Sequence, residues 1–584
     1  MMLDRRTFLR ISSLTAVSLS AWHPRIEAST PTAGLVLRNG KIITVDSNDH
    51  IAQALAIRNG QILDVGSNES ISKYIGHETK IIDLQGKTVT PGLIDSHAHL
   101  PFLGLRENGS WVNLQGHYTL EEVLEALFQK TRKTATGDWI FAWGLESMSL
   151  EFMNKTDLDK VSRKHPIVIA HTTGQWGFAN TYALDVAGIS KDTPNPVGGK
   201  IDKSSLTGEP TGLLIHYQAL YLVRKHIPSD YDGFQRALLY ACQLYAAEGV
   251  TTIHDNFVPF SEIGSGNSVN GYSQVLLGGK LPLRIKLWPY IPNINVALQV
   301  VGDISNSKDV NPHSALKGLL FLKKEDPGLF ESIWGGWKIA VDGGGPTALY
   351  YQNPFGLAMH PQKDFFELVN LLHQSDQQIS IHSVGDRAVD LSLKAIEIAL
   401  QRKLRRDHRH RLEHAMMPSS NALPFMKELG IVISTHPQFI YGWGDNMEGL
   451  RRRDFPGGRV IPLKSYIKND IPVAFGADPP AFPFIQPQIA LSQATIRTSR
   501  RGAKFNSSES ISIKEAIRIQ TMGSAYAAFQ EKQIGSLEKG KEADLVVWDS
   551  DFLAITADKI SKVKAELTII NGKIVYQRNK NGLS

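Results

Sequence analysis

Cysteine is almost absent from this sequence of 584 residues, since Cys242 is the only one. A single thiol forms no disulfide framework within the chain and cannot supply a cysteine-rich zinc site. Cys242 lies in the apolar, helix-like stretch from Leu238 to Ala247, which indicates a small buried residue. Any metal site in this chain must therefore use other ligands.

A basic stripe, an internal repeat and a low-complexity tract are also lacking. The formal net charge is +6, and residues 1–29, with four arginines and two acidic residues, carry two of these charges. The remaining charge is spread over a large surface, which argues against nucleic acid as a partner. Hydrophobic residues make up 42% and charged residues 21%, as in soluble globular proteins, and the length predicts more than one domain.

The N-terminal segment is short of apolar residues for a membrane span. Arg5 and Arg6 precede Phe8 and Leu9, and the serine-rich stretch 11–22 that follows is only modestly apolar. This pattern is typical of a twin-arginine signal peptide, here residues 1–29, although two arginines near a start also occur by chance. We expect cleavage near Ala28, export to the periplasm or outside the cell, and no membrane span in the mature protein.

Both ends of the mature chain are rich in β-forming residues. Leu35–Val45, Ala54–Val65 and Leu567–Tyr576 each contain an Asn-Gly pair between two apolar runs, which predicts three hairpins, and Ala543–Trp548 predicts a further strand. The sequence therefore predicts one small β-sandwich domain built from residues 30–88 and 529–584.

Residues 89–528 alternate short apolar runs with longer helical patterns, which indicates an α/β fold of the (β/α)8 TIM-barrel type. Within it, residues from about 104 to 220 are expected to insert a subdomain over the barrel mouth. The expected strands are Trp139–Trp143, Ile167–Ala170, Thr251–His254, Leu283–Leu287, Gly336–Val341, Gln378–His382, Arg409–His414, Val432–His436 and Val473–Gly476. Helices are expected at Gly233–Glu248, Gln362–Gln374, Ala388–Arg402 and Ile513–Ala528.

The stretch from Pro91 to Leu100 holds the main functional motif. Its apolar start indicates a buried strand, and His97 and His99 are two residues apart, so both imidazoles point to one side. Two neutral imidazoles can bind one divalent metal. By itself the pair could equally be two ordinary surface histidines.

Four further polar residues fall at or near the ends of expected strands, where barrel enzymes place their catalytic groups: Lys338, His382, His414 and Asp478. Each has a structural alternative, since a lone histidine can be a hydrogen-bonded core residue. Lys338 could form an ion pair with Asp342, and Asp478 could begin a helix. Their occurrence in order over successive units favours a shared site.

These motifs together resemble the amidohydrolase superfamily, in particular amidohydrolase family 3, the branch that includes N-substituted formamide deformylases. The resemblance spans about residues 33–578. It implies that His97 and His99 hold the more buried metal and that His382 and His414 hold a second position. It also implies that Lys338, carboxylated by carbon dioxide, bridges the two positions, and that Asp478 contacts metal and water. The implied cofactor is a divalent metal, one or two ions; zinc fits best, without excluding manganese, iron or nickel.

The resemblance implies hydrolysis of a carbon–nitrogen bond in a small molecule: an amide, formamide or cyclic amide. Metal-bound hydroxide would attack the carbonyl while Asp478 shuttles the proton to the leaving nitrogen. Hydrolysis of an ester or lactone by the same centre is an alternative, and so is a non-catalytic binding protein that keeps the barrel. The sequence names neither the substrate nor the oligomeric state, for which a homodimer is one option.

Two departures from the branch concern the substrate. Gln175 stands where the branch commonly has histidine, and His436-Pro437 stands where it often has Gln-Pro. We expect Gln175, Trp176, His436 and Trp443 to face the substrate. Nearby His171 could replace the missing imidazole. The other aromatic candidates for an apolar pocket are Trp111, Trp143, Phe178 and Tyr441.

Overall fold

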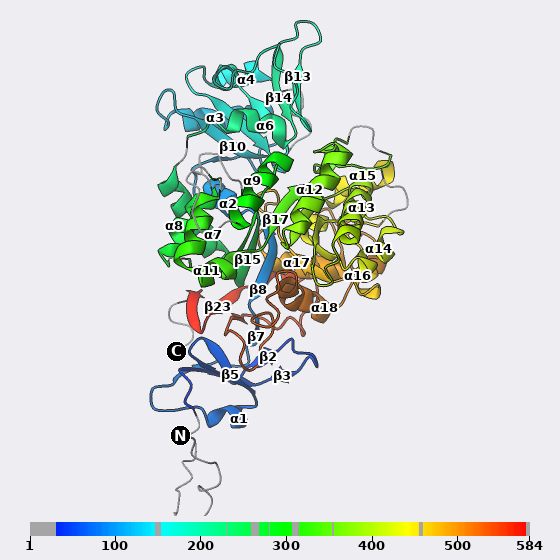
Figure 1. Ribbon diagram of the computed structural model, residues 1–584. Helices are drawn as coiled ribbons and strands as arrows, with labels where there is room; N and C mark the ends of the chain where they lie inside the picture. Colours follow the sequence, from blue (N-terminus) through cyan, green and yellow to red (C-terminus); the bar gives the residue numbers. More distant parts are fainter. Residues whose placement is uncertain are drawn as a thin grey trace, which may run out of the picture.

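The computed structural model describes residues 31–146, 153–228, 230–258, 268–279, 281–305, 314, 316–352, 356–454 and 459–579. The expected signal peptide, residues 1–29, lies outside these. The described chain forms three regions stacked along one direction (Figure 1): a β-rich region from both chain ends, a central region of parallel strands and helices, and an upper mixed sheet.

The central region contains two sheets of parallel strands. One has the order β16 (Arg284–Pro289), β15 (Val250–Val258), β8 (Leu93–Ala98). The other runs from β17 (Trp337–Ala340) through β18 (Ile379–Ser383), β19 (Arg411–His414) and β20 (Val432–Thr435) to β21 (Val473–Phe475). Parallel bridges from Leu287 to Trp334 and from Tyr290 to Lys338 join the sheets. These strands coincide with the expected ones, and α7 (Tyr231–Ala247), α12 (Gln362–Gln374) and α13 (Asp386–Arg402) confirm three expected helices.

The expected helix Ile513–Ala528 is present from Ile513 to Tyr526, but its middle is a π-helix. Helix α18 (Ile513–Arg518) continues as a π-helix, η4 (Ile519–Gly523), and then as α19 (Ser524–Tyr526). From this turn the Gln520 amide donates to the carbonyls of Ile94 (2.7 Å) and Phe475 (3.3 Å). Gln520, which is buried, thus connects β8 to β21 through its side-chain hydrogen bonds, and it lies in the π-helical part of this segment.

The lower region combines both ends of the chain. Its six-stranded sheet has the order β24 (Lys573–Gln577), β23 (Ala565–Ile570), β22 (Leu545–Trp548), β7 (Thr88–Pro91), β2 (Lys41–Ile43), β3 (Ile51–Ala52). A four-stranded sheet has the order β5 (Gln61–Gly66), β4 (Ala54–Arg58), β1 (Leu35–Arg38), β6 (Lys80–Asp83). The hairpins β4–β5 and β23–β24 are confirmed, and in both Asn-Gly turns the two residues have positive φ, as a type I′ turn requires.

The expected hairpin at Leu35–Val45 is wrong. Strand β1 pairs with β4 and β6, whereas β2 pairs with β7 and β3 in the other sheet. Asn39 has a φ of 59°, but Gly40 does not adopt positive φ, so the pair makes no type I′ turn. The Asn39 amide instead donates to Asp83 at 2.8 Å, and the chain passes from one sheet to the other.

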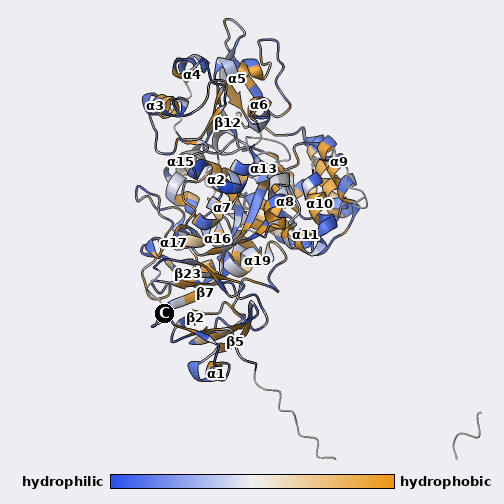
Figure 2. Cartoon of the chain, turned by 90° about the vertical axis from the view of Figure 1, so that its left-hand side faces the viewer, coloured by the Kyte–Doolittle hydropathy of each residue, from blue (hydrophilic) through white to orange (hydrophobic). Residues whose placement is uncertain are grey.

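The upper sheet has the order β13 (Lys200–Lys203), β14 (Pro210–Ile215), β12 (Trp176–Ala179), β11 (Ile167–His171), β10 (Ile140–Leu145), β9 (Val112–Asn113), all within the expected insert. Its strands contact four helices, which Figures 1 and 2 show in the same region: α3 (Leu120–Thr131), α4 (Lys155–Val161), α5 (Thr181–Val186) and α6 (Tyr217–Arg224). In Figure 2, α3 and α4 show both hydrophilic and hydrophobic turns, as expected of helices with one buried face.

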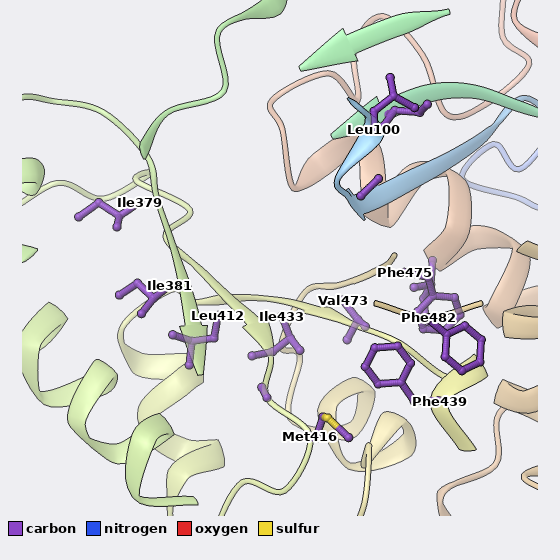
Figure 3. Packing of buried hydrophobic residues seen from close by; sticks show 14 of the residues in the cluster. Leu100, Ile379, Ile381, Leu412, Met416, Ile433, Phe439, Val473, Phe475 and Phe482 are labelled. Carbon is purple, nitrogen blue, oxygen red and sulfur yellow. The ribbon is translucent and has the colours of Figure 1, made fainter. Parts of the chain in front are cut away.

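The core of the central region lies between the parallel strands and their helices. Alternate residues of each strand point outward into it, among them Ile379, Ile381, Leu412, Ile433 and Val473, all buried (Figure 3). Burying a side chain of this size contributes roughly 1.5–3 kcal/mol. The side chains of the residues between them point to the opposite face of the sheet. No helix among the described residues is long and apolar enough to cross a membrane.

Candidate metal centre

The inner face of the second parallel sheet is polar. Ser380 and His382 alternate with the outward isoleucines of β18, and Arg411 and Glu413 flank Leu412 on β19. All of these polar side chains except His382 are fully buried. The strands therefore carry hydrogen-bonding and charged groups toward one another, next to the strand ends where His382 and His414 lie.

Two of the expected site residues have a left-handed backbone. His414 has a φ of 71° and Asp478 a φ of 57°, values that residues other than glycine rarely adopt. His414 follows the inward Glu413, so regular strand geometry would turn it outward. The positive φ instead turns its side chain toward the other histidines. Such conformations cost of the order of 1–3 kcal/mol and persist where the surroundings enforce them.

His97, His99 and Asp478 lie together at the ends of β8 and β21. Asp478 Oδ1 is 3.0 Å from His99 Nε2 and 3.5 Å from His97 Nε2. The backbone holds the two ends in place, since the Asp478 amide donates to the His97 carbonyl at 2.7 Å. The ligand atoms of the three side chains lie within 4.8 Å of one another, close enough to hold one metal ion.

A second group of possible ligands contains His97, His414 and His436, all buried, again with ligand atoms within 4.8 Å. Their ring centroids are 4.8 Å (His97–His414), 5.2 Å (His97–His436) and 4.8 Å (His414–His436) apart. His382 adjoins this group, with its Nδ1 at 2.8 Å from His414 Nε2. The structure thus brings five histidines to the same strand ends.

Lys338 is buried on β17, and its Nζ has no hydrogen-bond partner in the described part of the protein. The alternative of an ion pair with Asp342 is not realised, because Asp342 accepts from the backbone amides of Leu349, Val384 and Gly385. His382 Nε2 and His436 Nε2 are likewise buried without a hydrogen-bond partner among the described residues, and buried Asp478 Oδ1 has only the ion-pair contacts with His99 and His97 given above. Unpaired buried polar atoms cost about 1–3 kcal/mol each, so this donor set fits a bound cation.

The charges of the site favour metal binding. Burial lowers the pKa of His382 to about 3, with Lys338 adding to the effect, and burial also lowers the pKa values of His97 and His414. These imidazoles are therefore neutral, the form that ligates a metal. Burial lowers the pKa of Lys338 to about 8, which leaves a sizeable fraction of uncharged amine near neutral pH.

Glu413 and Arg411 are functional candidates to which the motif alone gave no role. Arg411 Nε donates to Glu413 Oε1 at 2.7 Å, and Glu413 Oε2 is 2.5 Å from His97 Nδ1. Burial by itself raises the pKa of Glu413, but Arg411 and Lys338 outweigh it and hold that pKa below its usual value. The available signal was two charged residues on either side of Leu412 in a short, buried strand.

A cavity of about 1340 Å³ opens over these strand ends and extends beneath the upper sheet. It is lined by Gln175 and Trp443, as expected, and by His171 and Trp143. Trp176 is not among the described lining residues; its ring stacks on His171 with centroids 4.3 Å apart. His436 is also absent from the lining and fully buried. Of the remaining aromatic candidates, Trp111 and Phe178 pack in the core, and Tyr441 packs against Phe484.

Neutral imidazoles and a carboxylate at the ends of parallel strands, with a buried lysine nearby and a roomy cavity above, fit a metal-dependent hydrolase. The chain belongs to the amidohydrolase family, whose model matches residues 80–576. It is an enzyme of this family, a hydrolase that acts on carbon–nitrogen bonds.

Two relatives match nearly the whole chain. It is 26% identical to the N-substituted formamide deformylase of Arthrobacter pascens over 562 residues, which cover 94% of this chain and 99% of the relative. It is 30% identical to the protein LONG AFTER FAR-RED 3 of Arabidopsis thaliana, over 94% of both chains. A metal-dependent hydrolase of Pyrococcus horikoshii shares the fold, with a TM-score of 0.65 at 22% identity, covering 90% of this chain and 99% of the other.

Proposed function

We propose that this enzyme hydrolyses the carbon–nitrogen bond of a small amide, formamide or cyclic amide. A divalent metal would be held by His97, His99, Lys338, His382, His414 and Asp478. The observation that carries the proposal is the convergence of unpaired, buried ligand atoms from several strands at the floor of one cavity. The relative that deformylates N-substituted formamides supports the choice of bond.

When bound, such a metal polarises a carbonyl and lowers the pKa of a water molecule to about 7. The chain itself supplies the proton transfer. Asp478 presents Oδ1 at the cavity wall, 3.0 Å from His99 Nε2, and can accept a proton from the attacking water. The same carboxyl then donates that proton to the leaving nitrogen. Gln175 and Trp443 line the cavity, where an amide and an indole can orient the substrate.

Several finer assignments belong to the same proposal. We infer that the eight parallel strands close into a barrel, with Gln520 completing the β8–β21 seam. Residues 30–88 and 529–584 would form the β domain, and residues 104–220 the insert. Zinc is the preferred metal, because imidazole and carboxylate ligands suit it. Lys338 would be carboxylated, since a carbamate, unlike an ammonium, can bind cations.

We further propose that residues 1–29 direct export by the twin-arginine route to the periplasm or beyond. This route carries folded proteins, so the enzyme would take up its metal before export. Comparing the distribution of the wild type between cell fractions with that of an Arg5→Lys, Arg6→Lys variant tests this. Sedimentation of the mature protein tests a homodimer.

Elemental analysis of the mature protein, purified without chelator, tests the metal centre, with His382→Ala alongside. Two zinc equivalents that fall in the variant support a binuclear centre with a carboxylated Lys338. One equivalent, unchanged in the variant, places a single ion at His97 and His99. Absence of metal in gently purified protein contradicts the proposal.

Asp478→Asn tests the proton transfer, because asparagine keeps the shape of the carboxylate without its basicity. We expect nearly complete loss of turnover with metal retained. Matched amide and ester substrates, assayed on the wild type, decide which bond is preferred. Retained turnover in the variant would contradict the role of Asp478.

A further inference from the structure

His436 follows β20, on the wall of the strand ends, but it does not reach the cavity. It is fully buried, whereas Trp443, which follows it along the chain, lines the cavity. A residue that selected substrates would have to be reached by them. Contact with the substrate therefore does not explain the presence of a histidine at position 436.

Hydrogen bonding fixes the tautomer of His436. Its Nδ1 lies 2.8 Å from the carbonyl oxygen of Gly476, and a carbonyl can only accept. Nδ1 therefore carries the hydrogen, and Nε2 presents a lone pair. That Nε2 is buried and has no partner among the described residues. Phe439 stacks on the ring, with centroids 4.6 Å apart, and holds its orientation.

The same logic applies to His97. Its Nδ1 faces the Glu413 carboxylate at 2.5 Å, which is an acceptor, so Nε2 again presents a lone pair. A ring nitrogen that donates to a carboxylate or carbonyl while the other nitrogen is free is the usual arrangement of metal-ligating histidine. Two such imidazoles lie in one group with His414, with ligand atoms within 4.8 Å of one another.

We propose that His436 is a metal ligand and forms a three-imidazole site with His97 and His414. This inference rests on the proposed function, but it changes the ligand set given there: His436 moves from substrate to metal, and His97 binds with His414 instead of with His99. It also limits the metal count: His97 has one free nitrogen, so it serves a single ion. Any second ion must be held without His97.

Zinc binding by the full mature chain tests the proposal. Apoprotein, prepared with a chelator, is titrated with zinc in competition with a chromophoric chelator. His436→Gln should lower the zinc affinity by more than about 100-fold, because loss of a supporting contact alone costs about 10–100-fold. His165→Gln is the matched control: His165 is also a buried histidine, hydrogen-bonded to Ser162 in the upper region, and its loss should leave the affinity unchanged.

X-ray absorption at the zinc edge gives a second measurement, whose wild-type result does not depend on how the variant folds. Wild-type protein loaded with one zinc equivalent should show three imidazole ligands, and His436→Gln should show one fewer. Two imidazoles in the wild type, or an unchanged affinity and spectrum in His436→Gln, would overturn the assignment. Wild-type protein that binds no zinc would instead overturn the proposed metal centre itself.

Discussion

Glu413 Oε2 lies 2.5 Å from Nδ1 of His97, and both side chains are almost completely inaccessible to solvent. These two residues are 316 positions apart in the chain. Arg411 donates to the other oxygen of the same carboxylate. Arg411, Glu413 and His97 therefore form one continuous chain of hydrogen bonds. This chain of hydrogen bonds ends at His97, whose Nε2 is the nitrogen that would bind the metal.

Glu413→Gln is expected to weaken zinc binding by about 10–100-fold, because the amide no longer fixes the tautomer of His97. It also leaves the buried Arg411 without its counter-ion, which should lower the free energy of unfolding by about 3–5 kcal/mol. Competition with a chromophoric chelator measures the first effect, and urea unfolding of the apoprotein measures the second.

Ser380→Ala serves as the control for Glu413, since Ser380 donates to Glu413 Oε1 at 2.8 Å without touching His97. It should cost stability but leave zinc affinity nearly unchanged. If Glu413→Gln is folded and binds zinc like the wild type, the carboxylate does not position His97.

Strand ends were predictable from sequence where a polar residue follows an apolar run, as with His382 and Asp478. Contacts across the site were not. Glu413, the partner of His97, lies 316 residues later in the chain. The sequence of its strand does not show which way its charged side chains point. The turn of His414 into the site depends on a left-handed φ, and strand periodicity predicts the opposite face.

Local signals also misled where tertiary contacts decide. The Asn-Gly pair at Asn39 resembles the two pairs that do form hairpins, but Asn39 is held by Asp83 and its flanking strands join different sheets. His436 was expected to face the substrate because it replaces the glutamine that the branch often has at this position of the motif. The contacts with Phe439 and Gly476 that bury its ring are tertiary contacts, which the sequence does not show.

Gln520→Leu is expected to destabilise the fold by roughly 2 kcal/mol. The variant removes the amide that donates to the buried carbonyls of Ile94 and Phe475, and leucine offers them no hydrogen. Urea unfolding measures the loss. Gln401→Leu, at an exposed position on α13, should change stability by no more than about 0.5 kcal/mol. Equal effects of the two variants would show that the β8–β21 seam does not depend on Gln520.

A network of histidines at the opposite ends of the strands should make stability depend on pH. His373 Nδ1 is 2.9 Å from His410 Nε2, and His408 Nε2 is 2.8 Å from the Leu429 carbonyl. Burial lowers the pKa of all three histidines, that of His408 to about 4. The unfolded chain therefore binds more protons below pH 6.5, and stability should fall as the pH drops from about 6.5 toward 4.

His408→Gln isolates one member of that network. Glutamine can still donate to Leu429 but does not titrate, so the slope of unfolding free energy against pH should decrease by up to about 1.4 kcal/mol per pH unit between pH 6 and 4.5. Urea unfolding at several pH values measures the slopes. An identical slope in His408→Gln and wild type would mean that His408 keeps its ordinary pKa in the folded protein.

Carboxylation of Lys338 should make reconstitution of the apoprotein depend on bicarbonate. Only the uncharged amine reacts with carbon dioxide, forming the carbamate N–C bond and releasing a proton. Because burial lowers the pKa of Lys338 to about 8, the reactive fraction rises as the pH increases from 7 toward 8.5. With bicarbonate present, zinc content and turnover should rise over this range and then level off.

Carbon-13 bicarbonate should give a carbamate NMR signal in the wild type and none in Lys338→Gln. Full reconstitution in degassed, bicarbonate-free buffer at pH 7 would show that Lys338 acts, if at all, as an unmodified amine.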